Sequence, residues 1–257
     1  MRGTPVRSEL VEAQLAPVGQ GFDRPVLSKV EGLGPNAVGT KRRKPLLLRP
    51  LAKPLLFVVC LLPFAWLLYG AISSLYGVNT LGVNPAETLI RATGDWTLRF
   101  LCITLAVTPL RQWSKQPALA RFRRMLGLFT FFYAGVHFLC YSWLDMGLVL
   151  EDIVRDIPKR PFILVGTSAL LLMTPLALTS FNRAIKALGA PRWQALHRAV
   201  YAVALLAILH FFWMRAAKHN FAEVAVYASI IGTLLGWRLW TRSRARAQPT
   251  VSNSSTP

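Results

Sequence analysis

Residues 125–144 read MLGLFTFFYAGVHFLCYSWL and carry no charged side chain. A stretch of this length and character predicts a membrane-spanning helix, because the hydrocarbon core of a bilayer requires about 20 apolar residues. Five further stretches are comparably apolar, although the second and fifth are short and need their flanks to complete the crossing. The six predicted spans are residues 55–76, 96–110, 125–144, 161–179, 199–213 and 225–240. They predict an all-α membrane protein built as a six-transmembrane-helix bundle.

The distribution of charge predicts how this bundle is oriented, because Lys and Arg concentrate in cytoplasmic loops. Segments with Lys and Arg but no acid alternate along the chain, at residues 41–53, 111–124, 183–198 and 242–246. The acids beyond residue 40 lie in the other loops, at Glu87, Asp95, Asp145, Glu151, Asp152, Asp156 and Glu223. We therefore predict that both termini are cytoplasmic. The acidic outer loop at 145–156 is expected to dock a partner electrostatically, unless it is only a solvated face.

The formal net charge of +19 has a second interpretation, as a nucleic-acid-binding surface. That interpretation needs a basic face on a soluble module, and no recognition motif accompanies the charge. We instead expect the cations to meet anionic membrane lipid, at about 1 kcal/mol per residue near the surface, and we expect no nucleic-acid partner. Cys60, Cys102 and Cys140 lie inside predicted spans without CxxC spacing, which is typical of small core residues rather than disulfides or metal ligands.

The two ends of the chain differ from the spans in composition. Residues 1–40 are rich in Gly, Pro, Val and Glu with no sustained apolar period, which predicts a disordered N-terminal extension. No basic start followed by an apolar run occurs before Leu55, so we expect no secretory signal peptide. Residues 41–246 are predicted to form one six-helix transmembrane domain, and residues 247–257 a disordered tail.

Three of the four histidines lie in or at the edge of predicted spans: His137, His197 and His210. An imidazole inside a bilayer is costly unless it ligates something or faces a polar cavity, and haem iron is the first candidate. Counted from Arg124 and Arg198, His137 and His210 both lie roughly 18 to 20 Å from the cytoplasmic arginines. Two imidazoles at one depth on two helices suit one haem with two axial ligands. The alternative is that they only form hydrogen bonds between helices.

His197 lies near the cytoplasmic face, about 20 Å along the helix from His210. At that level the third span has Arg123 and Arg124 instead of a histidine. His197 is therefore a weaker ligand candidate, which could bind a second haem with an unusual partner or lie beside another cofactor. Arg99 is again about 18 Å from the cytoplasmic arginines, and we predict that it pairs with a haem propionate unless it snorkels to the outer interface.

Seven short motifs occur in a fixed order along the chain. They are NPAE at 84–87, TGDW at 93–96, TPLR at 108–111, RRMLGL at 123–128, PLALTS at 175–180, WQALHR at 193–198 and LHF at 209–211. In sequence and order they resemble the MsrQ (YedZ) family of bacterial inner-membrane haem proteins. The resemblance covers about residues 50–240 and leaves the first 40 residues unmatched.

The resemblance implies a b-type haem protein of the ferric-reductase-like transmembrane group, multi-pass in the bacterial inner membrane. Such a subunit would pass electrons from the cytoplasmic side or the quinone pool, with a quinol or a flavin reductase as donor, to a periplasmic molybdopterin methionine sulfoxide reductase. The family's histidine pattern matches His137, His197 and His210. The family also uses FMN, and its paired arginines match Arg123 and Arg124, which could equally be topology signals.

Other classes of protein would share some of these features. Another ferric-reductase-like cytochrome b would have the same haem bundle. A self-sufficient ferric reductase or NADPH oxidase would also need a flavin and nicotinamide domain with a Gly-rich phosphate loop, which we do not find, so we expect a separate electron donor. A non-haem transporter would also place histidines in spans, but we find neither an internal repeat nor paired Gly/Pro-broken helices.

Overall fold

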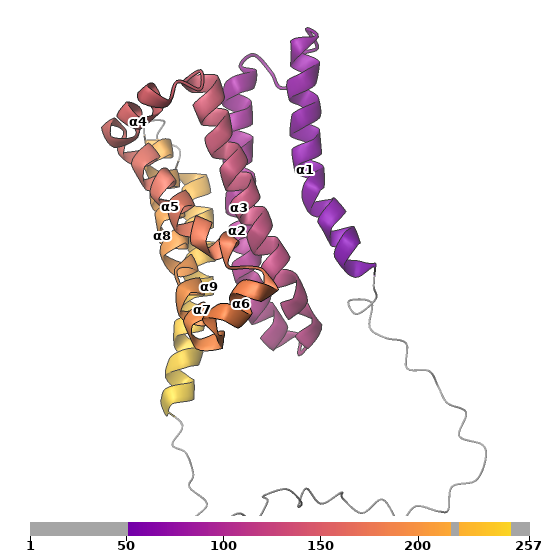
Figure 1. Ribbon diagram of the computed structural model, residues 1–257, viewed down its shortest axis with the longest axis vertical. Coiled ribbons are helices and arrows are strands. Elements are labelled where there is room, and N and C mark those ends of the chain that lie inside the picture. Colours follow the sequence, from indigo (N-terminus) through magenta and orange to yellow (C-terminus); the bar gives the residue numbers. More distant parts are fainter. Residues whose placement is uncertain (1–50, 217–220, 248–257) are drawn as a thin grey trace, which may run out of the picture. The chain divides into compact units, whose positions relative to one another are not determined.

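The computed structural model describes residues 51–216 and 221–247, with side chains through residue 244. The described residues form helices and no strand (Figure 1). The predictions for residues 1–40 and for the tail beyond residue 247 lie outside the described residues. In chain order the elements are α1 (Ala52–Leu75), α2 (Pro85–Trp113), the 3₁₀ turn η2 (Pro117–Leu119), α3 (Ala120–Cys140), the π-helical turn η3 (Tyr141–Asp145), α4 (Leu150–Lys159), α5 (Pro161–Leu178), α6 (Asn182–Leu188), α7 (Ala190–His197), α8 (Val200–Ala216) and α9 (Ala222–Ala247).

Five helical stretches of the described chain are long and apolar enough to cross a membrane. They are Ala52–Leu75, Pro117–Asp145, Pro161–Leu178, Ala190–Ala216 and Ala222–Arg244. Large apolar side chains on these helices, such as Leu55 and Leu205, remain exposed on the protein surface, as lipid contact requires. The predicted all-α membrane fold is confirmed.

The predicted span at 96–110 lies within α2, which is not one of those five stretches. Its 29 residues are about 43 Å long, enough to cross a bilayer. However, Glu87, Arg91, Asp95 and Arg99 recur at every fourth position with alternating charge. Residues at this spacing are neighbours on a helix surface, and Arg91 forms an ion pair with Glu87. This charged stripe lowers the hydropathy of α2 although the opposite faces of the helix are apolar.

The apolar faces of α2 make it the central helix of the bundle. Leu98 and Leu105 pack with Phe211 of α8 and with Ile231 of α9 in one core cluster. On another face, Phe100 belongs to a cluster with residues of α1 and α3. Helix α2 therefore links the two sides of the bundle, and residues along it can contribute to sites on α3, α5 and α8.

Helix α1 is bent (Figure 1), and it contains a proline, Pro63, in its interior. Proline interrupts the helical hydrogen-bond pattern because it lacks an N–H group and crowds the preceding turn. The fully buried Tyr133 hydroxyl lies at this interruption: it donates to the Cys60 carbonyl (2.9 Å) and accepts from the Phe64 N–H (3.0 Å). A side chain of α3 thus satisfies the backbone of α1 and fixes where the two helices meet.

The segment between α5 and α8 is not one continuous helix. It consists of the short helices α6 and α7, which lie toward the end of the bundle opposite α4 (Figure 1). Gly189 separates α6 from α7 with a φ of 73°, a left-handed conformation that favours glycine. Helix α7 then ends at His197, and α8 begins at Val200. His197 and His210 therefore belong to two different helices, and their side-chain directions are not related by one continuous helical wheel.

Candidate functional site

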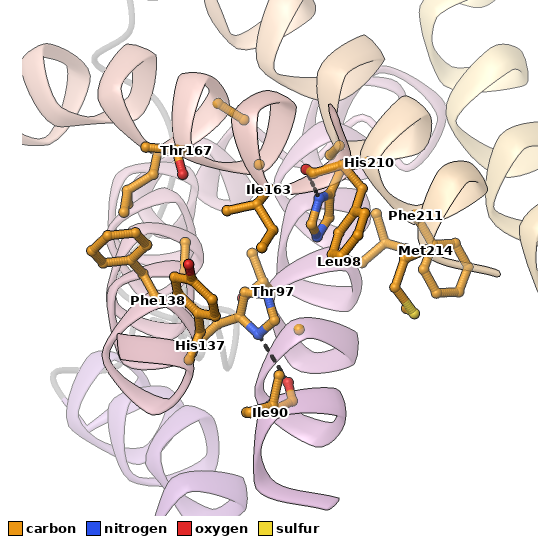
Figure 2. A pocket seen from close by; sticks show the side chains of 18 of the residues that line it. Ile90, Thr97, Leu98, His137, Phe138, Ile163, Thr167, His210, Phe211 and Met214 are labelled. Carbon is orange, nitrogen blue, oxygen red and sulfur yellow. Dashed lines mark hydrogen bonds between the residues drawn. The ribbon is translucent and has the colours of Figure 1, made fainter. Parts of the chain in front are cut away.

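A pocket lies between α2, α3, α5 and α8, and the two depth-matched histidines line it (Figure 2). Their ring centroids are 6.0 Å apart, and the ring planes cross at 77°. The pocket holds about 1260 Å³ of space, counting its open mouth. Its inner wall is apolar, with Leu101, Ala134, Met173 and Val203 among the lining residues. The structure therefore brings His137 and His210 together in a space large enough for a planar organic cofactor.

Each of these histidines forms a hydrogen bond to the backbone of a neighbouring helix (Figure 2). His137 Nδ1 lies 2.8 Å from the Ile90 carbonyl oxygen on α2, and His210 Nδ1 lies 2.6 Å from the Phe162 carbonyl oxygen on α5. A carbonyl only accepts, so both imidazoles carry their proton on Nδ1. Neither Nε2 atom has a hydrogen-bond partner among the described residues. Fixing Nδ1 in this way leaves Nε2 available as a metal ligand.

Charged side chains gather at one end of this pocket. Arg91, Asp95, Asp145 and Arg160 line it, and Arg160 Nε forms an ion pair with Asp156 Oδ1 at 2.9 Å. Arg99 is not among the residues that line the pocket. Its guanidinium lies instead over the Trp96 ring, 4.7 Å from the ring centroid. The predicted contact between Arg99 and a propionate stays a prediction, and Arg91 and Arg160 are the arginines that the structure places at the pocket.

A second pocket brings together the other three predicted residues. Arg123 and Arg124 of α3 and His197 of α7 all line it, and it holds about 1000 Å³, again counting open space. Arg124 Nη1 donates to the Asn182 side chain (2.7 Å) and to the Ser180 carbonyl (3.2 Å), which fixes its direction. Two arginines beside an aromatic wall suit an anionic, planar ligand, because arginine provides fork-shaped donors for a phosphate.

His197 is held differently from the other two histidines. Its ring stacks on the Trp193 ring with centroids 4.0 Å apart and planes at 28°, and its Nδ1 lies 3.1 Å from the Trp193 carbonyl oxygen of the same helix. Its Nε2 is buried without a hydrogen-bond partner among the described residues. The described residues contain no group of three or more His, Cys, Asp or Glu side chains arranged around a metal position.

The two pockets adjoin one another. Leu101, Thr130 and Met173 line both, so a single layer of side chains separates the spaces. A ligand in the pocket of Arg123 and His197 would therefore lie close to one between His137 and His210.

Comparison with known proteins identifies the family. Residues 93–208 match the model of the ferric reductase like transmembrane component, a range that includes His137 and His197 and ends just before His210. A protein of Polaromonas naphthalenivorans named "Protein-methionine-sulfoxide reductase heme-binding subunit MsrQ" is 64% identical over 213 residues, which are 83% of this chain and 94% of that relative. This chain belongs to the MsrQ family.

Further proteins with the same name support this conclusion. The one from Bordetella pertussis is 51% identical over 199 residues, covering 76% of this chain and 93% of the relative. The one from Herminiimonas arsenicoxydans is 46% identical over 210 residues, covering 80% of this chain and 94% of the relative. No solved structure matches the chain. The predicted resemblance to the MsrQ family is thus confirmed over most of the chain.

Sequence reasoning did not identify several residues of the first pocket. Arg91 and Arg160 are not among the predicted site residues, and the carbonyl groups of Ile90 and Phe162 carry no sequence signal at all. Arg91 belongs to the charged stripe of α2, and this spacing is visible in the sequence. The carbonyl acceptors follow from how the helices pack against one another, and no sequence pattern reports that packing.

Proposed function

We propose that this chain binds a b-type haem between His137 and His210 and acts as the membrane electron-transfer subunit of a methionine sulfoxide reductase system. The observation that carries the proposal is the shared arrangement of the two imidazoles: each is fixed through Nδ1, and the two rings meet in one pocket. The names of the relatives, which describe heme-binding subunits, agree with it.

The residues present fit a haem. Two imidazoles on one metal, each bonded at about 2.0–2.1 Å, have ring centres roughly 6 to 7 Å apart, and the observed separation is 6.0 Å. The apolar wall suits the macrocycle. The arginines at the charged end, Arg91 and Arg160, suit its carboxylates. The predicted contribution of Arg99 remains a competing proposal for the same carboxylates.

When bound, haem supplies one-electron redox chemistry, and the protein sets its potential through the ligands and their hydrogen bonds. His137 and His210 would hold the iron through Nε2. The carbonyl groups of Ile90 and Phe162 keep the Nδ1 protons in place and raise the basicity of the ligating nitrogens. The buried Val203 and half-buried Leu170 exclude water from the inner wall.

The haem content of purified variants tests this proposal. His137→Ala and His210→Ala should each lose the low-spin haem absorption, because each removes one axial ligand. His197→Ala is the matched control: it removes an imidazole that lines only the second pocket, so the absorption of the haem between His137 and His210 should remain. Wild-type haem-to-protein ratios and spectra in both His137→Ala and His210→Ala would refute the assignment.

We further infer that the second pocket holds FMN, with Arg123 and Arg124 on its phosphate and His197 beside it. The pairing of two cations with the stacked Trp193 ring supports this. His197 could alternatively ligate a second haem. Flavin content should fall in the Arg123→Ala, Arg124→Ala double variant while the haem between His137 and His210 is retained. The Arg192→Ala variant, which changes a nearby arginine that does not line this pocket, should keep wild-type flavin content; equal content in the double variant would leave the two arginines as topology signals.

We infer that α2 also spans the membrane, which makes six spans with the five apolar stretches. We further infer that both termini face the cytoplasm of a bacterial inner membrane. The positions of the acidic and basic helices in the structure support this orientation. Helix α4, with exposed Glu151 and Asp152, lies at one end of the bundle, and the basic helices α6 and α7 lie toward the other (Figure 1). The second pocket is then on the cytoplasmic side, within reach of a quinol or a flavin reductase as donor.

We propose that the electrons leave on the periplasmic side to a molybdopterin methionine sulfoxide reductase. Methionine sulfoxide requires reduction to restore the apolar side chain. In a reconstituted system, haem reduced under anaerobic conditions should reoxidise only when both the reductase and a methionine sulfoxide substrate are added. Omitting either component is the control. Haem that stays reduced in the complete mixture would contradict the assigned role.

A further inference from the structure

The rings of His137 and His210 each lie directly against a glycine of the neighbouring helix. A Cβ atom built on Gly94 of α2 would be 3.1 Å from His137 Cε1 and 3.2 Å from His137 Nδ1. A Cβ atom built on Gly166 of α5 would be 2.8 Å from His210 Nδ1 and 2.9 Å from His210 Cε1. Both glycines also line the pocket. Each imidazole therefore occupies space that any other residue at that position would fill.

The two contacts between a glycine and a histidine ring have the same position relative to the carbonyl that binds the ring. The carbonyl that accepts the His137 hydrogen bond belongs to Ile90, four residues before Gly94, and the carbonyl that accepts the His210 hydrogen bond belongs to Phe162, four residues before Gly166. Residues four apart lie one above the other on a helix face. On both helices, the glycine opens a place for the ring, and the carbonyl one turn earlier holds its Nδ1 proton.

We propose that Gly94 and Gly166 are positioning residues that set the orientation of the two axial imidazoles, a role that rests on the haem proposed above. Each glycine lets the ring approach the helix closely enough for Nδ1 to reach the carbonyl, and so directs Nε2 away from that helix into the pocket. His197 differs in that no glycine of the described chain lies against its ring, which stacks on Trp193 instead. The arrangement thus distinguishes the proposed ligand pair from the third histidine.

The distances predict an order of severity for the two alanine variants. At Gly166 the added methyl would be closer than 3.0 Å to two ring atoms, so the His210 ring must move away from the α5 carbonyl. At Gly94 the contacts of 3.1 and 3.2 Å require the His137 ring to give by only a few tenths of an ångström. Gly166→Ala should therefore disturb the iron ligands more than Gly94→Ala.

The chain provides matched controls for these substitutions. Gly135 is on α3, only two residues before His137, and a Cβ built there would meet nothing within 4 Å. Gly232, on α9, lines neither pocket, and a Cβ built there would also meet nothing within 4 Å. Alanine has a higher helix propensity than glycine, so Gly135→Ala and Gly232→Ala should fold at least as well as the wild-type chain. Any general effect of glycine removal from a span would appear in these controls.

The experiment compares the four alanine variants in the full-length haem-loaded protein. The readouts are the EPR spectrum of the oxidised haem, which responds to ligand orientation, and the rate of haem transfer to excess apomyoglobin. Loss of a partner outside the metal ligands typically weakens binding by about 10- to 100-fold. We expect faster haem loss and shifted EPR signals for Gly166→Ala, smaller changes in the same direction for Gly94→Ala, and wild-type behaviour for both controls.

The outcomes separate this inference from the proposed function. If the wild-type protein has a bis-histidine haem but Gly94→Ala and Gly166→Ala behave like the controls, the positioning role is wrong and the haem site stands. If the wild-type protein shows no such haem, the proposed function itself fails. Should Gly166→Ala not fold, Gly94→Ala decides the question, because its milder contacts allow the helix to form; an unchanged EPR spectrum in that variant would overturn the proposal.

Discussion

Replacing Tyr141 by Phe removes a single hydroxyl group that connects α4 to the charged end of the first pocket. Tyr141 is buried, and its hydroxyl donates to Asp156 Oδ2 at 2.7 Å. The Asp156 side chain is only 13% exposed and also accepts from Arg160 Nε at 2.9 Å. Ile153 of α4 packs with Tyr141 and Ile163 in the core beneath this contact.

The expected effect follows from this geometry. A hydrogen bond to a buried, charged acceptor contributes about 1.5–3 kcal/mol. Because Asp156 keeps Arg160 as a partner in the variant, and Arg160 itself is 45% exposed, we expect the lower half of that range. A loss of roughly 1.5–2 kcal/mol raises the open population of α4 by about 10- to 30-fold. The backbone amides of α4 should exchange hydrogen faster by this factor, measured by mass spectrometry in lipid nanodiscs.

Arg155→Gln provides the matched control on the same helix. Its ion pair with Glu151 has the same four-residue spacing, but both side chains are about two-thirds exposed. Exposed pairs of this kind contribute only about 0.3–0.5 kcal/mol, so exchange in α4 should change by little more than twofold. Equal exchange rates in Tyr141→Phe and the wild-type chain would show that the buried contact does not hold α4.

Two further experiments test charged residues of α2 and α4. Arg91→Gln removes a cation that lines the first pocket, so it should lower the midpoint potential of the haem by on the order of tens of millivolts, while Arg99→Gln should leave it unchanged; the reverse result would restore Arg99 as the propionate partner. Glu151→Gln combined with Asp152→Asn should slow electron transfer to the reductase at low salt but not at high salt, since both carboxylates are exposed; equal rates at all salt concentrations would make α4 only a solvated face.

The sequence predicted the fold and much of the site because both depend on simple periodic quantities. Apolar run length predicted six spans, of which the structure shows five as long apolar helices. The rise of a helix was sufficient to place His137 and His210 at one level, and the structure brings their ring centroids to 6.0 Å from one another. The shallower level of His197 also agrees with its position in a pocket with Arg123 and Arg124. These placements require no knowledge of how the helices pack.

The features that the sequence did not predict depend on how each helix is rotated about its axis and on which helices contact one another. Arg99 lies at the same predicted level along its helix as the pocket, but it is on a face of α2 that directs its guanidinium over the Trp96 ring. The amphipathic helix α4 lies in what was expected to be a loop. The contacts of Gly94 and Gly166 depend on how α2 packs against α3 and how α5 packs against α8. Counting residues along a single helix gives the depth of a side chain but not these contacts.

The spin state of the haem tests the central claim most directly. In the oxidised wild-type protein, EPR should show a low-spin ferric haem, because two imidazoles complete the coordination of the iron. The low-spin signal should disappear in His137→Ala and in His210→Ala, and should persist in His197→Ala. A high-spin signal in the wild-type protein, or a low-spin signal that survives in both His137→Ala and His210→Ala, would contradict the account.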